Sequence, residues 1–340
     1  LTLSSGNWLA TIEYNAVGNQ TVVAGEYEGG LIIGSGGVKS ANGDLTVHFS
    51  LSLNGILDMV THQLLDGSSA FTLSGSSALR TQSTNNPPIP SGKTWSTVVF
   101  NGTSGTQYIP EGTYAVLGET GNPQLISHEA TGDITITGQL FDLGVNLDMK
   151  TFRILSDGDG FTTSALGTYT ISTQNLSIAP FPSDITWNSG ATINFNSSVG
   201  DQYIPQGTYY NLQCKSDSSS IQRHKKITRG NITVSNGLHI LDSDTYLVLH
   251  HLLSGNFTTN SSGTYGFLVI DGSSPASAFP SGKTWFNGID IDQASYSIPS
   301  MTLVNEDLYI GQNSSLGGNI TFSGSGNLEM GNGGAVTLDC

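Results

Sequence analysis

The sequence predicts an all-β solenoid built from four copies of a pattern about 90 residues long. Three observations predict it: evenly spaced tryptophans, short strand and turn markers that recur in one order, and a composition poor in helix formers. In a solenoid each coil hydrogen-bonds to the coils before and after it, so the core is one continuous apolar column. Coils of roughly 20 residues would place about four coils in each copy.

The tryptophans set the period of the pattern. They are Trp8, Trp95, Trp187 and Trp285. Successive members are separated by 87, 92 and 98 residues, and no tryptophan falls outside this register. On this period the chain divides into four repeats, which are residues 1–86, 87–178, 179–276 and 277–340. The fourth repeat is incomplete, so we expect the chain to belong to a longer protein with further repeats.

A five-residue string, here named the glycine-Asx string, recurs once in every repeat. Its copies are Gly43–Val47, Gly132–Ile136, Gly230–Val234 and Gly318–Phe322. Each copy begins with glycine and Asp or Asn, and continues with an aliphatic residue, threonine and a last apolar residue. Apolar and polar residues in alternation predict a short strand, and the glycine and Asx residues are typical of the turn before it.

A third marker, Ile-Pro-x-Gly-Thr-Tyr, lies between tryptophan and string at residues 109–114 and 204–209, and the first repeat has Val22-Val23-Ala24-Gly25 instead. Proline second and glycine fourth in a type I turn would fix the backbone where the chain reverses. We expect the four tryptophans and four marker residues to anchor equivalent coils, each buried aromatic contributing about 2 to 3 kcal/mol. The marker residues are Pro110, Pro205, Tyr114 and Tyr209.

Composition and charge exclude several classes of partner. Charged residues make up 11% of the chain and glycine contributes 43 residues, which is typical of β-rich extracellular proteins and unfavourable for long helices. The formal net charge of −15 opposes binding to nucleic acid or to an anionic membrane. No apolar run approaches the roughly 18 residues of a membrane span, so we expect no membrane insertion of this segment.

The order of the markers, together with a Leu-Asp/Glu-Met triplet, resembles the repeats of very large surface adhesins that gliding and related Gram-negative bacteria export by type IX secretion. The triplets are Leu57–Met59, Leu147–Met149 and Leu328–Met330, whereas the third repeat has Leu241–Asp244. The resemblance implies a right-handed parallel β-helix, an extracellular position on the cell surface, and a non-enzymatic role as an adhesin, stalk or filament. The expected partners are further repeats of the same protein, neighbouring copies and surface glycans.

Tandem β-sandwich domains are the alternative architecture, because 90 to 100 residues is about the size of an immunoglobulin-like domain. The polar stretches 81–90 and 272–280 would then be linkers between independent cores. The drift in repeat length favours the solenoid, which absorbs extra residues as corner loops.

Few residue patterns point to chemistry. Asp157 and Asp159 could contribute to a Ca²⁺ site, because Ca²⁺ takes several carboxylate oxygens, but the rest of an EF-hand loop is missing and we expect solvated turns and no cofactor. Thr135 and Thr137 give one instance of the Thr-x-Thr spacing that could suggest ice binding, without a regular array in the sequence. Cys214 and Cys340 occupy unrelated repeat positions, so we expect no disulfide framework and a buried Cys214.

One basic cluster interrupts the acidic chain. It comprises Arg223, Lys225, Lys226 and Arg229. The third repeat has 43 residues from tryptophan to string, against 35 and 37 in the first two, so we expect the cluster to be an exposed insertion whose functional variant is contact with a partner. An anionic glycan would suit it, as would the basic groups of a polysaccharide lyase. A β-helical carbohydrate-active enzyme, either a lyase or a glycoside hydrolase, is therefore the alternative function.

Overall fold

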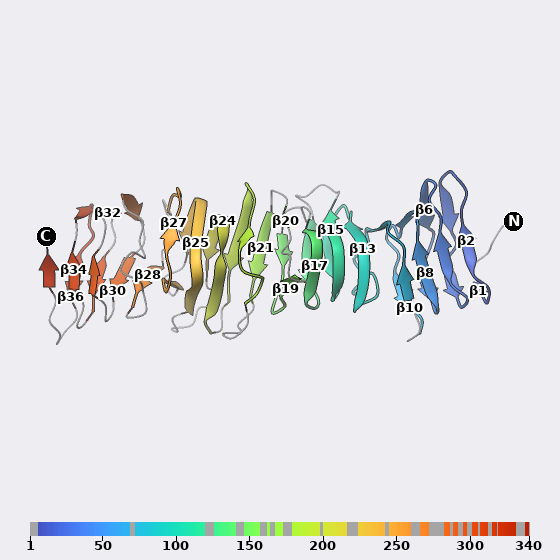
Figure 1. Cartoon of the computed structure of the whole chain (residues 1–340), viewed down its shortest axis with the longest axis horizontal. Coiled ribbons are helices and arrows are strands. Elements are labelled where there is room, and N and C mark those ends of the chain that lie inside the picture. Colours follow the sequence, from blue (N-terminus) through green and yellow to red (C-terminus); the bar gives the residue numbers. More distant parts are fainter. Residues whose placement is uncertain are drawn as a thin grey trace. The chain divides into compact units, whose positions relative to one another are not determined.

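A computed structural model of the chain is all-β, and the residues that it describes contain no helix. The described residues are 6–68, 72–119, 126–140, 146–156, 162–163, 167–172, 179–197, 200–215, 224–241, 245–259, 266–271, 282–285, 288–291, 295–297, 301–304, 307–311, 315–317, 319–330 and 337–339. The chain forms two compact units, Leu1–Gly167 and Thr168–Cys340. Within each unit the strands lie side by side, one coil after the next (Figure 1).

The first unit contains three sheets, and each early coil contributes one strand to each sheet. A further set of strands begins at Gly105. The first sheet holds β1 (Gly6–Trp8), β4 (Gly25–Tyr27), β7 (Leu45–Val47) and β10 (Leu64–Asp66). The second sheet holds β2 (Ile12–Tyr14), β5 (Leu31–Ile33), β8 (Ser50–Leu53) and β11 (Thr72–Ser74). The third sheet holds β3 (Gln20–Val22), β6 (Val38–Ala41), β9 (Ile56–Asp58), β12 (Ala78–Thr81), β13 (Lys93–Phe100), β15 (Gly112–Glu119), β17 (Ile134–Leu140) and β19 (Ile154–Ser156), with β20 (Thr162–Thr163) beside β17. The additional strands are β14 (Gly105–Ile109), β16 (Ile126–Ala130) and β18 (Asn146–Asp148).

The second unit repeats this arrangement with longer strands at its start. Its main sheet holds β21 (Gly167–Ile171), β23 (Ala191–Phe195), β24 (Gln202–Cys214), β25 (His224–Ile240), β26 (Thr245–Val248), β28 (Phe267–Ile270), β30 (Gly288–Ile291), β33 (Leu308–Ile310) and β36 (Leu328–Met330), with β22 (Ile185–Thr186) beside β24 and β27 (Leu253–Ser254) beside β25. Two smaller sheets hold β29 (Lys283–Trp285), β32 (Met301–Val304) and β35 (Ile320–Ser323), and β31 (Ser295–Ser297), β34 (Ser315–Gly317) and β37 (Thr337–Asp339).

The strand pairs within both units are parallel, and each joins residues about one coil apart. Trp95 is in register with Tyr114, 19 residues later, and Tyr114 is in register with Ile136 after a further 22. Immunoglobulin-like sandwiches are built from antiparallel strands, so the alternative architecture is wrong. Stacked parallel coils agree with the predicted right-handed parallel β-helix.

The first three repeats each contain four coils, counted on the side of the solenoid that carries the tryptophan. In the second repeat these coils contribute residues 93–95, 112–114, 134–136 and 154–156 to one side of the solenoid. In the third repeat the same four positions are residues 185–186, 207–209, 232–234 and 253–254. The period of about 90 residues is therefore the length of four coils, and the variation in period comes from loops between strands.

The core is formed by the inward-facing positions of these short strands. A three-residue strand such as Leu31–Ile33 buries its first and last side chains and leaves the middle one partly exposed, as expected from the alternation of side chains along a strand. Trp95, Trp187 and Trp285 are almost completely buried, whereas Trp8 is half-buried and packs on Tyr27 with ring centroids 4.5 Å apart. The tryptophan period thus follows the apolar column inside the solenoid.

Candidate functional site

The tyrosine of the third marker closes the corner at which its own strand begins. The Tyr114 hydroxyl donates a 2.7 Å hydrogen bond to the carbonyl oxygen of Pro110, and Tyr209 donates one of 2.5 Å to Pro205. In the first repeat Tyr27 bonds Val23 in the same way, which explains why proline is dispensable there. Burial raises the pKa of the Tyr114 and Tyr209 hydroxyls far above their ordinary value, so both remain donors.

The marker does not reverse the chain as the sequence suggested. Pro205 lies inside the continuous strand β24, where the parallel register shifts between Pro205 and Gly207. In the second repeat Pro110 and Glu111 separate two strands, β14 and β15, that both pair in parallel with the next coil. The marker is therefore a bend at a corner, and a turn that reversed direction would have broken the parallel stacking.

The glycine-Asx string joins the coil that carries it to the coils before and after it. A Cβ on Gly132 would lie 2.4 Å from the Cβ of Glu111 in the preceding coil, so this position has no room for a side chain. Asp133 Oδ1 accepts a 2.9 Å hydrogen bond from the backbone nitrogen of Arg153 in the following coil. In the third repeat Asn231 Oδ1 accepts from the backbone nitrogen of Leu252 at 3.2 Å.

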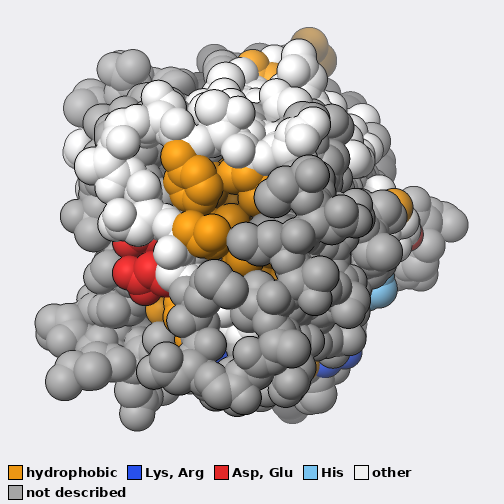
Figure 2. Space-filling view, turned by 90° about the vertical axis from the view of Figure 1, so that its left-hand side faces the viewer, with side chains coloured by type: hydrophobic (Ala, Val, Ile, Leu, Met, Phe, Trp, Pro, Cys, Tyr) orange, Lys and Arg blue, Asp and Glu red, His pale blue; other side chains and the backbone are white. Residues whose placement is uncertain are grey.

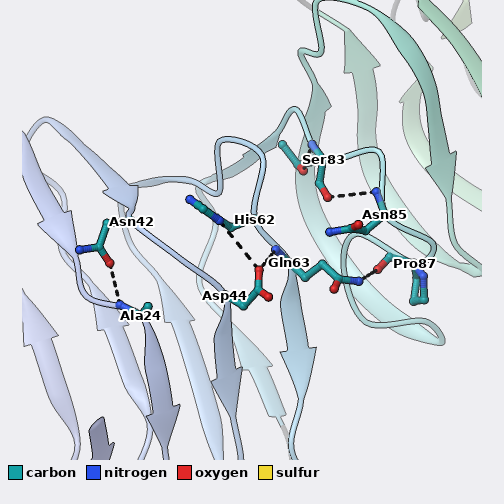
Figure 3. A network of polar contacts seen from close by, with 9 residues as sticks. Ala24, Asn42, Asp44, His62, Gln63, Ser83, Asn85 and Pro87 are labelled. Carbon is teal, nitrogen blue, oxygen red and sulfur yellow. Dashed lines mark hydrogen bonds and ion pairs between the residues drawn. The ribbon is translucent and has the colours of Figure 1, made fainter. Parts of the chain in front are cut away.

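Figure 3 shows the same kind of contact along one corner of the first repeat. Asn42 Oδ1 accepts from Ala24 N at 2.8 Å, and Asp44 Oδ1 accepts from Gln63 N at 2.8 Å. Gln63 continues the series, because its Nε2 donates to the carbonyl oxygen of Pro87 at 2.8 Å. Polar side chains at this corner thus satisfy backbone groups one coil away, which is a structural use of residues that could otherwise have formed a reactive site.

A second corner contains buried polar side chains that the sequence reasoning missed. Gln107 and Gln202 are fully buried, and each side-chain oxygen accepts from a backbone nitrogen five residues earlier, Gly102 at 3.0 Å and Ser197 at 2.9 Å. Gln20, which is half-buried, accepts in a similar way from the backbone nitrogen of Ala16, four residues earlier, at 2.9 Å. The recurrence of a glutamine before each third marker was the available signal.

Buried lysines occupy the next coil at two of these corners. Lys39 is in register with Gln20, and its ammonium donates to the carbonyl oxygens of Ala16 at 2.7 Å, Gly18 at 2.8 Å and Gly36. Lys226 is in register with Gln202 and donates to the carbonyl oxygen of Ser197 at 3.0 Å. Both lysines are completely buried, so each ammonium must be satisfied by protein groups, and carbonyl oxygens of the corner loop accept its hydrogen bonds.

The basic cluster is therefore divided between the core and the surface. Lys225, Lys226 and Arg229 lie in strand β25, and successive side chains of a strand face opposite sides. The expectation that Lys226 contacts a partner is wrong, because its side chain is inside the solenoid. Lys225 and Arg229 are exposed, and the Arg229 guanidinium lies 3.5 Å from the centre of the Tyr203 ring. These two residues belong to a coil rather than to an insertion.

Three other predicted residues lie outside the described residues. They are Arg223 of the basic cluster and the pair Asp157 and Asp159. Cys214 is described: it is fully buried in strand β24 and is a free thiol. Burial raises the pKa of the Cys214 thiol to about 12, against the opposing charge of Lys226. Cys214 is thus the buried apolar residue that the sequence predicts.

The outer face beside the tryptophan column carries a ladder of hydroxyls. The register aligns Thr94, Thr113 and Thr135 on three successive coils of the second repeat. In the third repeat Thr186, Thr208, Thr233 and Ser254 are aligned in the same way. The hydroxyls thus form a single row with one member per coil. The sequence did not reveal this row, because its members are about 20 residues apart along the chain and not two.

A shallow hollow of about 210 Å³ lies against this ladder in the second repeat. It is lined by Gly92, Glu111, Gly112, Thr113, Asp133, Thr135 and Leu155. Of its two carboxylates, Asp133 is already held by Arg153, whose Nε and Nη2 lie 3.0 and 2.5 Å from Asp133 Oδ2. The hollow is open and polar, which suits a weakly held hydroxylated ligand more than a sequestered reaction centre.

Apolar side chains are exposed on the last described coils of the second unit. Figure 2 views the end at which the C-terminus lies, where hydrophobic side chains gather near the middle of the face. Tyr309, Phe322 and Leu328 are 38%, 37% and 41% exposed. Phe322 and Leu328 lie on β35 and β36, the outermost described strands of their sheets, where a further coil or a second copy could stack and cover them.

No protein-family model matches this sequence, and comparisons with curated proteins and with solved structures find no match either. The described residues include no helix long and apolar enough to span a membrane.

Proposed function

We propose that the chain is a non-enzymatic, extracellular segment of a surface adhesin or structural filament. The observation that carries the proposal is the use of the repeated residues. The glycine, Asx, tyrosine and tryptophan residues that recur pack the core or bond one coil to the next. Repetition therefore multiplies a scaffold, which suits a protein that projects from a surface, whereas catalysis requires one set of reactive groups.

Two surfaces support an adhesive role. The hydroxyl ladder offers donors and acceptors at the spacing of one coil, about 4.8 Å, along the second and third repeats. The exposed Lys225 and Arg229 provide positive charge on the third repeat, where an anionic glycan could bind. The resemblance to adhesins exported by type IX secretion supports the proposed location at the cell surface.

Display of the chain on cells that do not otherwise adhere would test the proposal. We expect such cells to bind immobilised glycans or each other more strongly than cells that display an unrelated protein of similar size. Replacing Lys225 and Arg229 together by glutamate should weaken binding to anionic glycans and leave far-ultraviolet circular dichroism unchanged. Equal adhesion by both cell types on every surface would contradict the proposal.

The alternative, a β-helical carbohydrate-active enzyme, is favoured by the two carboxylates that line the hollow of the second repeat. It predicts that the purified chain releases oligosaccharides from a polysaccharide, and that Glu111→Gln abolishes the release. We expect no new reducing ends or unsaturated products from a panel of neutral and anionic polysaccharides. Release that depends on Glu111 would instead establish the enzyme.

A further inference from the structure

Three side chains with metal-ligating atoms meet on the outer face of the first repeat. Glu26 and Glu28 leave the same side of the chain at strand β4, and His48 follows strand β7 one coil later. His48 Nε2 lies 3.6 Å from Glu26 Oε2, and His48 Nδ1 lies 3.6 Å from Glu28 Oε2. One ligating atom from each residue lies within 4.8 Å of those of the other two.

Neighbouring residues hold the imidazole and one carboxylate in place. The backbone nitrogen of His48 donates to the carbonyl oxygen of Tyr27 at 3.0 Å. A Cβ on Gly67 would lie 2.7 Å from three ring atoms of His48, so the ring lies directly against this glycine in the next coil. Glu28 Oε1 accepts from Asn7 Nδ2 at 3.4 Å, which links the first coil to the group. Supporting contacts of this kind orient metal ligands in known sites.

One ring nitrogen of His48 makes no hydrogen bond. His48 Nε2 is buried and has no hydrogen-bond partner, although the histidine side chain as a whole is 23% exposed. Glu26, whose side chain is 54% exposed, places Oε2 3.6 Å from this nitrogen. A cation between them would be bound by both atoms and would also separate the negative charges of Glu26 and Glu28.

Glu26, Glu28 and His48 are not repeated at the equivalent positions of the other repeats, so the architecture of the coil does not require them. The position of Glu26 is Thr113 in the second repeat and Thr208 in the third. The residue after the corner tyrosine, Glu28, corresponds to Ala115 and Tyr210. The position of His48 is Thr137 in the second repeat and Ser235 in the third, so among these three repeats the two glutamates and the histidine come together in the first one alone.

We propose that Glu26, Glu28 and His48 form a binding site for a divalent first-row transition metal ion such as Zn²⁺. Imidazole and carboxylate suit these ions, whereas Ca²⁺ takes oxygen ligands. Ligands at about 2.1 Å from a tetrahedral Zn²⁺ are about 3.4 Å apart, close to the separation between His48 Nε2 and Glu26 Oε2. Water would complete the coordination on the exposed side, and the ion would clamp the second coil to the third.

Titration calorimetry of the full chain with ZnCl₂, after removal of metal by a chelator, tests the site. We expect saturable binding that is lost in His48→Gln and in Glu26→Gln. His62→Gln is the matched control, because His62 also lies beside a carboxylate, 4.0 Å from Asp44, but outside the group. Asn7→Ala should weaken binding by about tenfold, as expected when a ligand loses its orienting partner.

A folding defect and a lost ligand are distinguished by circular dichroism of each variant and by Glu26→Gln, whose exposed side chain can change without disturbing the core. X-ray absorption of the zinc-loaded chain should show one imidazole nitrogen among oxygen neighbours. The absence of saturable Zn²⁺ binding would overturn the proposal. So would affinity that is unchanged in both His48→Gln and Glu26→Gln.

Discussion

The hydroxyl of Tyr209 donates a 2.5 Å hydrogen bond to the carbonyl oxygen of Pro205, four residues earlier in the same strand. Tyr114 and Pro110 form the equivalent bond at 2.7 Å, one repeat away. The bond closes a corner inside a chain that keeps running parallel to its neighbours. The bend of the Ile-Pro-x-Gly-Thr-Tyr marker is therefore held by one side-chain donor. This donor is the tyrosine hydroxyl, which bonds a carbonyl oxygen of the same bend.

Removal of this donor should destabilise the solenoid. Tyr209→Phe leaves the buried Pro205 carbonyl without its partner, and we expect a loss of about 1 to 3 kcal/mol in the free energy of unfolding. Urea denaturation followed by circular dichroism measures it. Tyr309→Phe, at a position that is 38% exposed, is the control and should leave the midpoint unchanged. Equal midpoints for the two variants would contradict the role of the hydroxyl.

Replacement of the buried lysine should be harmful, whereas replacement of its exposed neighbour should not. Lys226→Met removes the ammonium that bonds the Ser197 carbonyl, and we expect a loss of about 1.5 to 3 kcal/mol, as for hydrogen bonds to charged groups. Lys225→Met should change stability by less than about 0.5 kcal/mol, since its side chain is exposed. The difference in thermal midpoint between the variants checks the prediction, which fails if Lys225→Met is the less stable protein.

The glycine of the string should not tolerate a methyl group. In Gly132→Ala the new Cβ would stand 2.4 Å from the Cβ of Glu111, and we expect a loss of about 1 to 3 kcal/mol from the forced shift between coils. Gly18→Ala is the matched control, because an added Cβ there has no atom within 4 Å. Denaturation midpoints of the two variants measure the contrast, and a Gly132→Ala protein as stable as the Gly18→Ala protein would refute it.

The Cys214 thiol should be inert in the folded chain. Its pKa rises from an ordinary value of 9.0 to about 12 on burial, so at pH 8 it is a buried thiol and not a nucleophilic thiolate. In a Cys340→Ser background, iodoacetamide should label Cys214 after unfolding and not before. The folded state binds the thiol proton more tightly than the unfolded state, so this group's contribution to stability is complete below pH 9 and declines between pH 9 and 12. Rapid labelling of the native chain at pH 8 would show that Cys214 is accessible.

The spacing of Trp95, Tyr114 and the string predicted the coils because each marker performs a local task that its residue types reveal. A buried aromatic residue, a glycine without room for a side chain and an Asx acceptor are recognisable in one dimension. The drift in period favoured a solenoid over separate domains, because loops between coils absorb extra residues, and the parallel arrangement was implied by the resemblance to surface adhesins.

Contacts between coils could not be predicted, because their spacing in the sequence is not constant. Gln20 meets Lys39 after 19 residues, whereas Gln202 meets Lys226 after 24. The same difficulty concealed the aligned threonines and the approach of His48 to Glu26. The basic cluster was misread for another reason: charge was counted along the chain, although alternate residues of a strand face opposite sides.

The glycine-Asx string gives the solenoid a direction. Its glycine packs against the preceding coil and leaves no room there for a side chain. Its Asx oxygen accepts a hydrogen bond from a backbone N–H of the following coil. In the first three repeats the coil that carries the string thus presents, on the side of the following coil, an acceptor oriented toward a backbone N–H. The two faces of such a coil are therefore chemically unequal, and so are the two ends of a fragment cut from the solenoid beside it.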